Sequence, residues 1–353
     1  DLFAKGKALA ERHAVDEPAA ALALLEVIRP LAPDPSAELD FRRALLERLL
    51  ARNPHDPEIA SRLAGAHEEK GDFEACERVL TPFEGRLGAL DGAATLGRAH
   101  ARRGRYEQAH ALLKPFVDAR LPGLRAAEQE YREAVQAAEE RAIDRLKRGN
   151  APGFDYQTYD RAAKPQQKAL VAAYVGDCLK NDPAARTARD ALIAHRAVAG
   201  AAVDLGLVQL HRGQTLADPA ARKAELEAAE KTFLSVRGFA GEDAEYRLSL
   251  GQVYHWLGRP DEARKLFDEV QAADRSTRTR LHLARVLREV GDTTGARQQA
   301  ETAYREEKDA AQKYVAARMR SVLFNDLDDA IHWLGLCDPD AQEVKAALAH
   351  ARG

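Results

Sequence analysis

The chain has 353 residues, of which 45% are hydrophobic and 31% are charged, and its formal net charge is -3. This composition is typical of a chain that folds in water, and 53 basic against 56 acidic residues argue against a dedicated nucleic-acid binder. Its three cysteines lie far apart, which excludes a disulfide scaffold and zinc-ligand spacing, and no apolar run reaches the ~20 residues that span a bilayer.

The N-terminal segment is predicted to be helical. Ala, Leu, Arg and Glu dominate the whole sequence, with almost no alternating β-branched pattern, which favours an all-α protein. Helices are predicted over 1–14 and 17–31, as one hairpin, and over 36–52. The last of these ends in the turn-forming run 53–57, Asn-Pro-His-Asp-Pro.

Two similar segments follow, at 63–80 and 96–113. Their glycines, Gly71 and Gly104, are 33 residues apart, and each is predicted to end the first helix of a pair. His67 and His100 occupy equivalent positions. They form either a metal-binding or pH-sensing pair or two ordinary interhelical histidines, and we expect the second because no further ligand is placed nearby.

A long helix is predicted over 122–149, with six basic and six acidic side chains. The loop 149–159 then gives the best boundary, so we expect an N-terminal block at 1–149, a linker at 150–164 and a C-terminal block at 165–353. Within the loop, Phe154, Tyr156 and Tyr159 either fold back onto the end of the first block or form a docking element for a partner.

Helices are predicted over 165–180 and 183–212. Cys178 and His195 fall on these successive helices, but nothing in the sequence orients them as a nucleophile and its base. No phosphate-binding loop, nucleophile elbow, zinc-protease motif or dinucleotide fingerprint is present. We therefore expect no enzyme, no cofactor and no metal site.

The clearest unit is 244–270. It carries Leu250-Gly251, Tyr254, Gly258 and then Ala263 and Phe267. This pattern resembles the tetratricopeptide repeat, whose signature is L-G-x2-Y followed by A-x3-F. The next unit repeats it 33 residues on, at Gly291 and Ala296.

The resemblance covers roughly two thirds of the chain and implies a right-handed α-solenoid of antiparallel helix hairpins. Small residues such as Gly251 then allow close helix approach, and Phe267 fills the space between repeats. A last unit is marked by Ala330 and Leu334, and 340–351 is predicted to be a closing helix.

In this family the first helices of the hairpins line a concave surface that holds partners. The candidate partner-binding residues on the two blocks are Gln252, His255, Trp256, Arg285 and Arg288, with Arg98 and Arg102. Arginine forks and an exposed tryptophan suit an acidic or aromatic peptide, whereas the alternative is a solvated face of paired charges. The lysine- and asparagine-rich clamp of chaperone-binding members is absent.

We therefore expect a non-catalytic scaffold that binds a protein or peptide, with no nucleic-acid partner and no membrane span. The alternative is the regulatory or sensor arm of a larger bacterial-type protease, kinase or transcription regulator. The start at Asp1 indicates an excised or processed form, and the expected location is the cytoplasm.

Overall fold

The computed structural model describes residues 2–324, 327–337, 344–345 and 347. In these ranges the regular structure is helical, which confirms the all-α prediction. The chain divides into two compact units at Leu205–Gly206, inside one helix, and each unit is described on its own. Of the predicted closing helix 340–351, only 344, 345 and 347 lie among the described residues.

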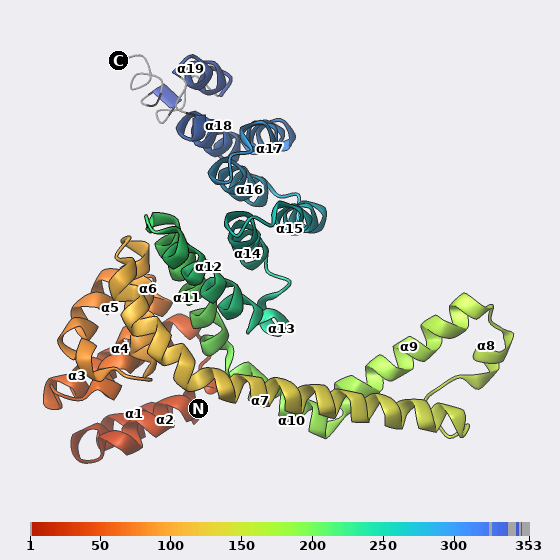
Figure 1. Cartoon of the computed structure of the whole chain (residues 1–353). Helices are drawn as coiled ribbons and strands as arrows, with labels where there is room; N and C mark the ends of the chain where they lie inside the picture. The colour runs from red at the N-terminus through yellow and green to blue at the C-terminus, as the bar shows by residue number, and fades with distance from the viewer. Residues whose placement is uncertain (1, 325–326, 338–343, 346, 348–353) are drawn as a thin grey trace. The chain divides into compact units, whose positions relative to one another are not determined.

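Unit 1 begins with hairpins that pack on a leucine-rich core, with Leu45, Leu49 and Ile59 fully buried. Figure 1 shows them at the N-terminal end of the chain. Its elements are α1 (Leu2–Asp16), α2 (Pro18–Ile28), η1 (Arg29–Leu31), α3 (Pro35–Arg52), α4 (Pro57–Glu69), α5 (Phe73–Leu80), η2 (Thr81–Arg86), α6 (Asp91–Arg102), α7 (Tyr106–Lys147), α8 (Tyr156–Arg161), α9 (Lys164–Asn181), α10 (Pro183–Ala194) and the first half of α11 (Arg196–Thr215).

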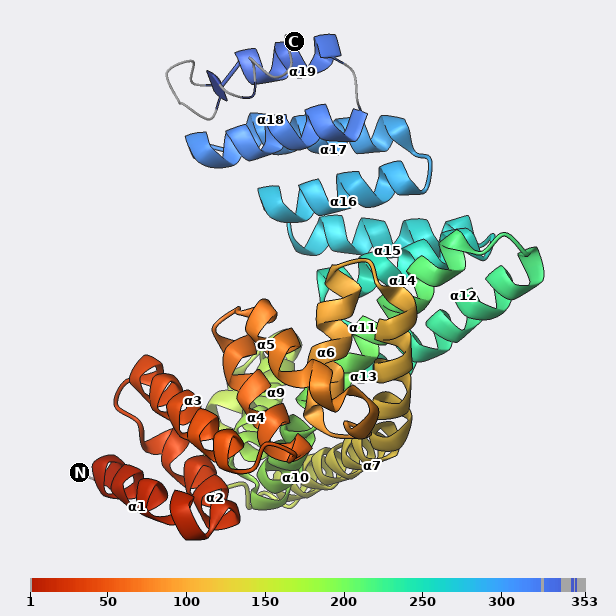
Figure 2. The same cartoon turned by 90° about the vertical axis from the view of Figure 1, so that its left-hand side faces the viewer.

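Unit 2 stacks further hairpins, which Figure 2 shows most clearly from α14 to α18. Its core is a series of small clusters between neighbouring helices, such as the one around Leu248, Phe267 and Leu283. Its elements are the second half of α11, then α12 (Pro219–Leu234), α13 (Arg237–Ala240), α14 (Ala244–Trp256), α15 (Pro260–Ala273), α16 (Thr277–Glu289), α17 (Thr293–Glu306), α18 (Ala310–Phe324) and α19 (Leu327–Gly335).

The turn between α3 and α4 shows how the sequence starts a helix. Asp56 accepts hydrogen bonds from the backbone nitrogens of Glu58 and Ile59, at 2.8 and 3.2 Å, and Pro57 is the first residue of α4. The aspartate satisfies two amides that have no partner inside the helix, and proline has no amide to satisfy. The Asp-Pro pair therefore fixes where α4 begins.

Four equivalent glycines end the first helices of their hairpins, as predicted. Gly71, Gly104, Gly258 and Gly291 have φ of 75°, 71°, 77° and 87°. The residue after each glycine donates its backbone N–H to the carbonyl five residues earlier, as in the 3.0 Å bond from Asp72 to His67. This is the Schellman arrangement, and its left-handed position costs glycine least.

As predicted, a small residue on the first helix of a hairpin lies against a large residue on the second helix. A Cβ placed on Gly251 would lie 2.4 Å from the Phe267 ring, and one on Gly97 would lie 2.7 Å from Leu113. Only glycine lets the two helices of each hairpin approach this closely, so the signature positions set the helix spacing.

The long helix differs from its predicted extent. It begins at Tyr106 rather than 122, because its first part is the second helix of a repeat and packs against α6 through Leu113. It then continues to Lys147, past Pro115 and Pro122, and pairs with α9 and α10 (Figure 1). We call residues 124–194 the arm.

Two predicted boundaries change as a consequence of the arm. The loop 150–164 lies inside unit 1 rather than between blocks, because α9 and α10 pack back onto α7. The single helix predicted over 183–212 is interrupted at His195, which separates α10 from α11.

Among the described residues no single helix is long and apolar enough to cross a membrane. The pair α10 and α11 passes that test only together, and it is bent by 44°.

Candidate functional site

In unit 2 the first helices α11, α14 and α16 share one face. Gln252 on α14 donates its side-chain Nε2 to Glu289 Oε2 on α16 at 2.7 Å, and Gln252 is only 6% exposed. The amide therefore ties neighbouring repeats together. Gln252 therefore has a structural role between repeats, and a partner would contact more exposed residues of the face.

A polar stripe runs along α16 at helical spacing, through His282, Arg285 and Glu289. Arg285 Nη2 donates to His282 Nε2 at 3.2 Å, and Arg285 Nε lies 3.9 Å from Glu289 Oε1. The Arg285 side chain is still 56% exposed. Its guanidinium is thus oriented by two neighbours while it stays accessible to solvent.

Two histidines of this face have lowered pKa values. Burial, and then the positive charge of Arg285, lower the pKa of His282. Burial also lowers the pKa of His211 on α11, although its hydrogen bond with Gln214 and the negative charge of Glu289 act in the opposite direction. Both rings are therefore held in the neutral form near neutral pH, so Arg285 supplies the positive charge at the centre of the face.

Trp256 follows Gln252 by one helical turn and is 37% exposed. Its ring meets the neighbouring His255 ring edge-on, with centroids 6.1 Å apart. His255 itself lines a different hollow of about 440 Å³, with Phe267 of α15 and Leu287 of α16. Trp256 is therefore accessible, and the half-buried His255 contributes to the wall of this hollow.

Arg288 is exposed on α16, one residue before Glu289. Its separation from Arg285 by three residues keeps both on the solvent side of the helix. Of the residues predicted to form one patch, Trp256, Arg285 and Arg288 are thus exposed, whereas Gln252 is buried between two repeats.

In unit 1, Arg98 does not offer its charge to a partner. Its Nε and Nη2 bond the two carboxylate oxygens of Glu68 at 2.8 and 2.9 Å, and its Nη1 bonds Asp204 at 3.2 Å. Burial opposes the charged form, but these bonds outweigh it and raise the pKa of Arg98. Arg98 is therefore a link between α4, α6 and α11.

Arg102 is exposed but packs on an aromatic ring. Its guanidinium carbon lies 3.6 Å from the centroid of Phe73 on α5. This cation–π contact holds α5 against the end of α6.

A hollow of about 350 Å³ opens on the α4 side of unit 1. Each arginine in its wall is paired with an acid, since Arg42 lies 2.6 Å from Glu69, Arg62 lies 2.9 Å from Glu58, and Arg120 lies 2.6 Å from Asp91. The arginines of this wall are thus neutralised by acidic side chains of the same unit.

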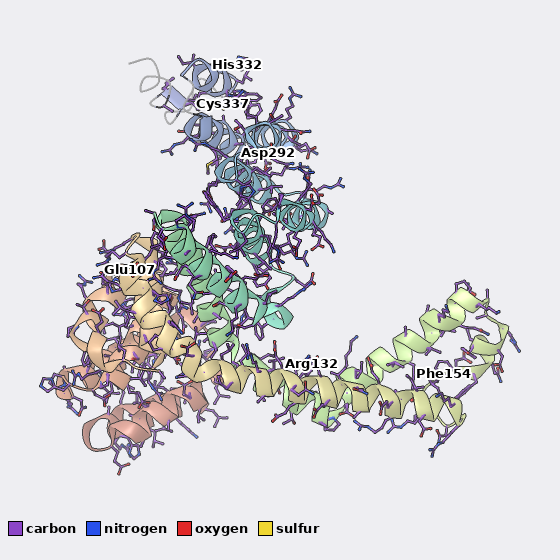
Figure 3. The ribbon with its side chains drawn as sticks, viewed as in Figure 1. Glu107, Arg132, Phe154, Asp292, His332 and Cys337 are labelled. Carbon is purple, nitrogen blue, oxygen red and sulfur yellow. The ribbon has the colours of Figure 1, made fainter. Side chains whose placement is uncertain are left out.

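The three loop aromatics pack on one another and on α9. The Phe154 ring lies 4.9 Å from Tyr156, 5.5 Å from Tyr159 and 5.5 Å from Tyr174 between centroids. Figure 3 labels Phe154 at the far end of the arm. They therefore close the turn from α7 to α9, rather than the end of the first repeat block, and residues from Tyr156 form α8 where a loop was predicted.

His67 and His100 are buried at equivalent positions but face different neighbours. His67 lies near Asp72 and Arg43, whereas His100 Nδ1 is 3.9 Å from Glu77. Burial is the main cause that lowers the pKa of both rings. Within the described part of the chain no group of three or more metal-ligand side chains gathers around either ring or elsewhere.

Cys178 and His195 are also separate. Cys178 interacts with Tyr174 on α9, whereas the His195 ring packs against Gly123, where an added Cβ would lie 3.1 Å from Cε1. No nucleophile–base geometry links the two.

Sequence reasoning missed Glu289, His282 and His211. Glu289 is the last residue of α16 and stands four residues after Arg285, so i,i+4 pairing was the available signal. His211 lies on α11, and its place near Glu289 and Arg285 depends on packing between repeats, which no pattern in the sequence signals.

No family model matches this chain, and no curated protein matches it. Matching solved structures include a tetratricopeptide repeat protein from Parabacteroides merdae, with 11% identity, 90% of this chain and 94% of that chain covered, and a TM-score of 0.46. Yeast Tom70 matches with 14% identity, coverage of 99% and 88%, and a TM-score of 0.26.

The chain is built of tetratricopeptide-like repeats. This statement rests on its own helix hairpins, on the 33-residue spacing of Gly258 and Gly291, and on the close contact of Gly251 with Phe267.

Proposed function

We propose that the chain is a protein-interaction scaffold, and that the α11–α14–α16 face of unit 2 holds an acidic peptide bearing an aromatic or other apolar side chain. The observation that carries this proposal is an accessible arginine, Arg285, which His282 and Glu289 hold on α16, with an exposed Trp256 on the neighbouring first helix α14.

The arrangement suits a carboxylate. A guanidinium presents parallel N–H donors that match two carboxylate oxygens, and one already oriented by its neighbours loses little side-chain freedom on binding. Arg288 adds a second exposed charge on the same helix. The partner would therefore be attracted by charge and held by its contact with Trp256.

The test uses two synthetic peptides of one sequence, one with Asp and Glu and one with Asn and Gln at the same positions, each with a central phenylalanine. We expect the acidic peptide to bind the full chain more tightly, with an affinity that falls as salt rises. Binding can be followed by isothermal titration calorimetry, which serves the Trp256→Ala variant as well as the parent.

Trp256→Ala should weaken binding by about 2 kcal/mol or more, and Arg285→Glu should slow association. Arg264→Glu is the matched control, since Arg264 is exposed on α15 and lines the other hollow. Equal binding of both peptides, or equal loss in the Arg264 control, would contradict the proposal.

A further inference from the structure

The arm carries a second surface that the proposed function does not use. A groove of about 710 Å³ runs between the end of α7 and α9. It is lined by Glu139, Ile143, Tyr159, Lys164, Gln167, Lys168, Val171, Ala172, Val175, Gly176 and Leu179.

The apolar residues of this groove follow helical spacing along α9. Val171, Val175 and Leu179 recur every four residues, so they form one stripe, and Ile143 of α7 stands beside them with 40% exposure. In the whole of α9 no described residue is fully buried. The helix packs on α7 with one side and leaves this stripe without a partner.

The two ends of the groove carry opposite charge. Lys164 and Lys168 stand at the N-terminal end of α9, beside Tyr159 of α8. Glu139 stands at the other end, because Arg141, two residues on, bonds Asp182 just after α9 at 2.6 Å. The two lysines therefore lie at the end of the groove nearest the tip of the arm, and Glu139 lies at the opposite end.

These three groove charges have no ion-pair partner among the residues that the structure describes. Two nearby arginines of α7 do have one, since Arg141 pairs with Asp182 and Arg148 pairs with Asp144 at 2.8 Å. The groove thus combines an apolar stripe with charges that are available to a partner.

We propose that the groove is a self-association surface, on which the arm of a second copy packs antiparallel about a two-fold axis. In that arrangement the apolar stripes face each other, and the tip lysines of each copy meet Glu139 of the other. A parallel arrangement would set lysines against lysines, which is unfavourable. The exposed Ala172 and the half-buried Gly176 lie near the middle of α9, and their small size lets the two helices approach closely.

The two arms then form a four-helix arrangement around a shared apolar seam. On each copy the apolar stripe from Val171 to Leu179 extends over about 12 Å of α9, at ~1.5 Å per residue. The proposed peptide-binding face belongs to unit 2 and shares no residue with the groove, so the dimer would carry that face twice and strengthen attachment to a repeated ligand.

Sedimentation of the full chain from about 1 to 100 µM tests the proposal, since interfaces of this modest size dissociate in that range. We expect a reversible monomer–dimer equilibrium. Ala172→Glu should weaken dimerisation by about tenfold or more, because it places a charge in the apolar seam. Ala173→Glu, one residue away on the same helix and outside the groove, should leave it within about twofold.

Charge exchange gives the sharper test. The pair of changes Lys164→Glu and Lys168→Glu, or Glu139→Lys alone, should each weaken dimerisation several-fold, and all three together should restore it, because the sign of every contact is then reversed. Circular dichroism and thermal melting of each variant show that the monomer still folds.

Three results of the association experiments would overturn the proposal, and so would one result of the melting experiments. The three association results are a chain that stays monomeric across this range, a dimer that tolerates Ala172→Glu, and charge changes whose effects merely add. A melting temperature lowered by Ala172→Glu but not by Ala173→Glu in the dilute monomer would also overturn it, since the groove would then be covered by the chain itself. None of these outcomes depends on peptide binding at Trp256.

Discussion

The regular repeats of unit 2 and the arm of unit 1 are both paired helices, yet they hold together in different ways. In the hairpin of α14 and α15, glycine at 251 admits the Phe267 ring, and the contact is closed to solvent. In the arm, α9 has no fully buried described residue and Gly176 has open space around it. A repeat completes its core with its neighbours in the chain, whereas the arm leaves part of its apolar surface for something else.

The largest expected difference comes from deleting an aromatic ring in each region. Phe233 is fully buried and touches the position of Gly206, so Phe233→Ala should cost about 3–5 kcal/mol. Phe154 is half-buried at the tip of the arm, and Phe154→Ala should cost about 1 kcal/mol. Denaturant unfolding followed by circular dichroism measures both. Similar losses would mean that the arm is as tightly packed as the repeats.

The same substitution at two glycines should then give effects of opposite sign. Gly251→Ala brings a Cβ to 2.4 Å from Phe267 and should destabilise by about 1–3 kcal/mol, with Gly251→Leu worse. Gly176→Ala meets nothing within 4 Å and should stabilise α9 by about 0.5 kcal/mol or more through helix propensity. Thermal melting of the two variants checks the pair. A harmless alanine at 251 would show that Phe267 can move aside.

The smallest effect is a pH dependence confined to the repeats. Burial, and then Arg105, lower the pKa of His100 below 6.5 in the folded chain. The unfolded chain therefore binds more protons once the pH falls below about 6.5, and the free energy of unfolding decreases from there towards the lowered pKa.

Replacing His100 with the tyrosine that the repeat signature favours should flatten this dependence. Melting temperatures of the parent and of His100→Tyr, taken between pH 8 and pH 5, give the comparison. A parent whose stability does not fall faster than that of the variant below pH 6.5 would contradict the expectation.

The sequence predicts the repeats well because their contacts are local and periodic. Gly71, Gly104, Gly258 and Gly291 end first helices, and each does so through backbone geometry that glycine alone adopts cheaply. The contact of Gly251 with Phe267 follows from the same signature. Such features are encoded within about 33 residues of sequence and need no knowledge of distant packing.

The arm and the candidate face were harder to predict, because both depend on non-local pairs. The bond from Gln252 to Glu289 joins two repeats, and the burial of Arg98 depends on Asp204, which lies 106 residues away. The sequence of one helix does not predict which of its faces is exposed when a segment much later in the chain packs against that helix. The start of α7 at Tyr106 was missed because Pro115 and Pro122 are usual helix breakers.

Those two prolines also give α7 a mechanical property. Each lacks an amide hydrogen, so the carbonyls of Ala111 and Asp118, four residues earlier, lose their usual main-chain donors. The prolines are seven residues apart and both are exposed, so the weakened turns lie on one side of the helix. Their bends add instead of cancelling, and Figure 1 shows α7 changing direction between its two halves. The helix is therefore most compliant in a single plane, and a load applied at the tip would flex the arm in that plane before it disturbed the repeats.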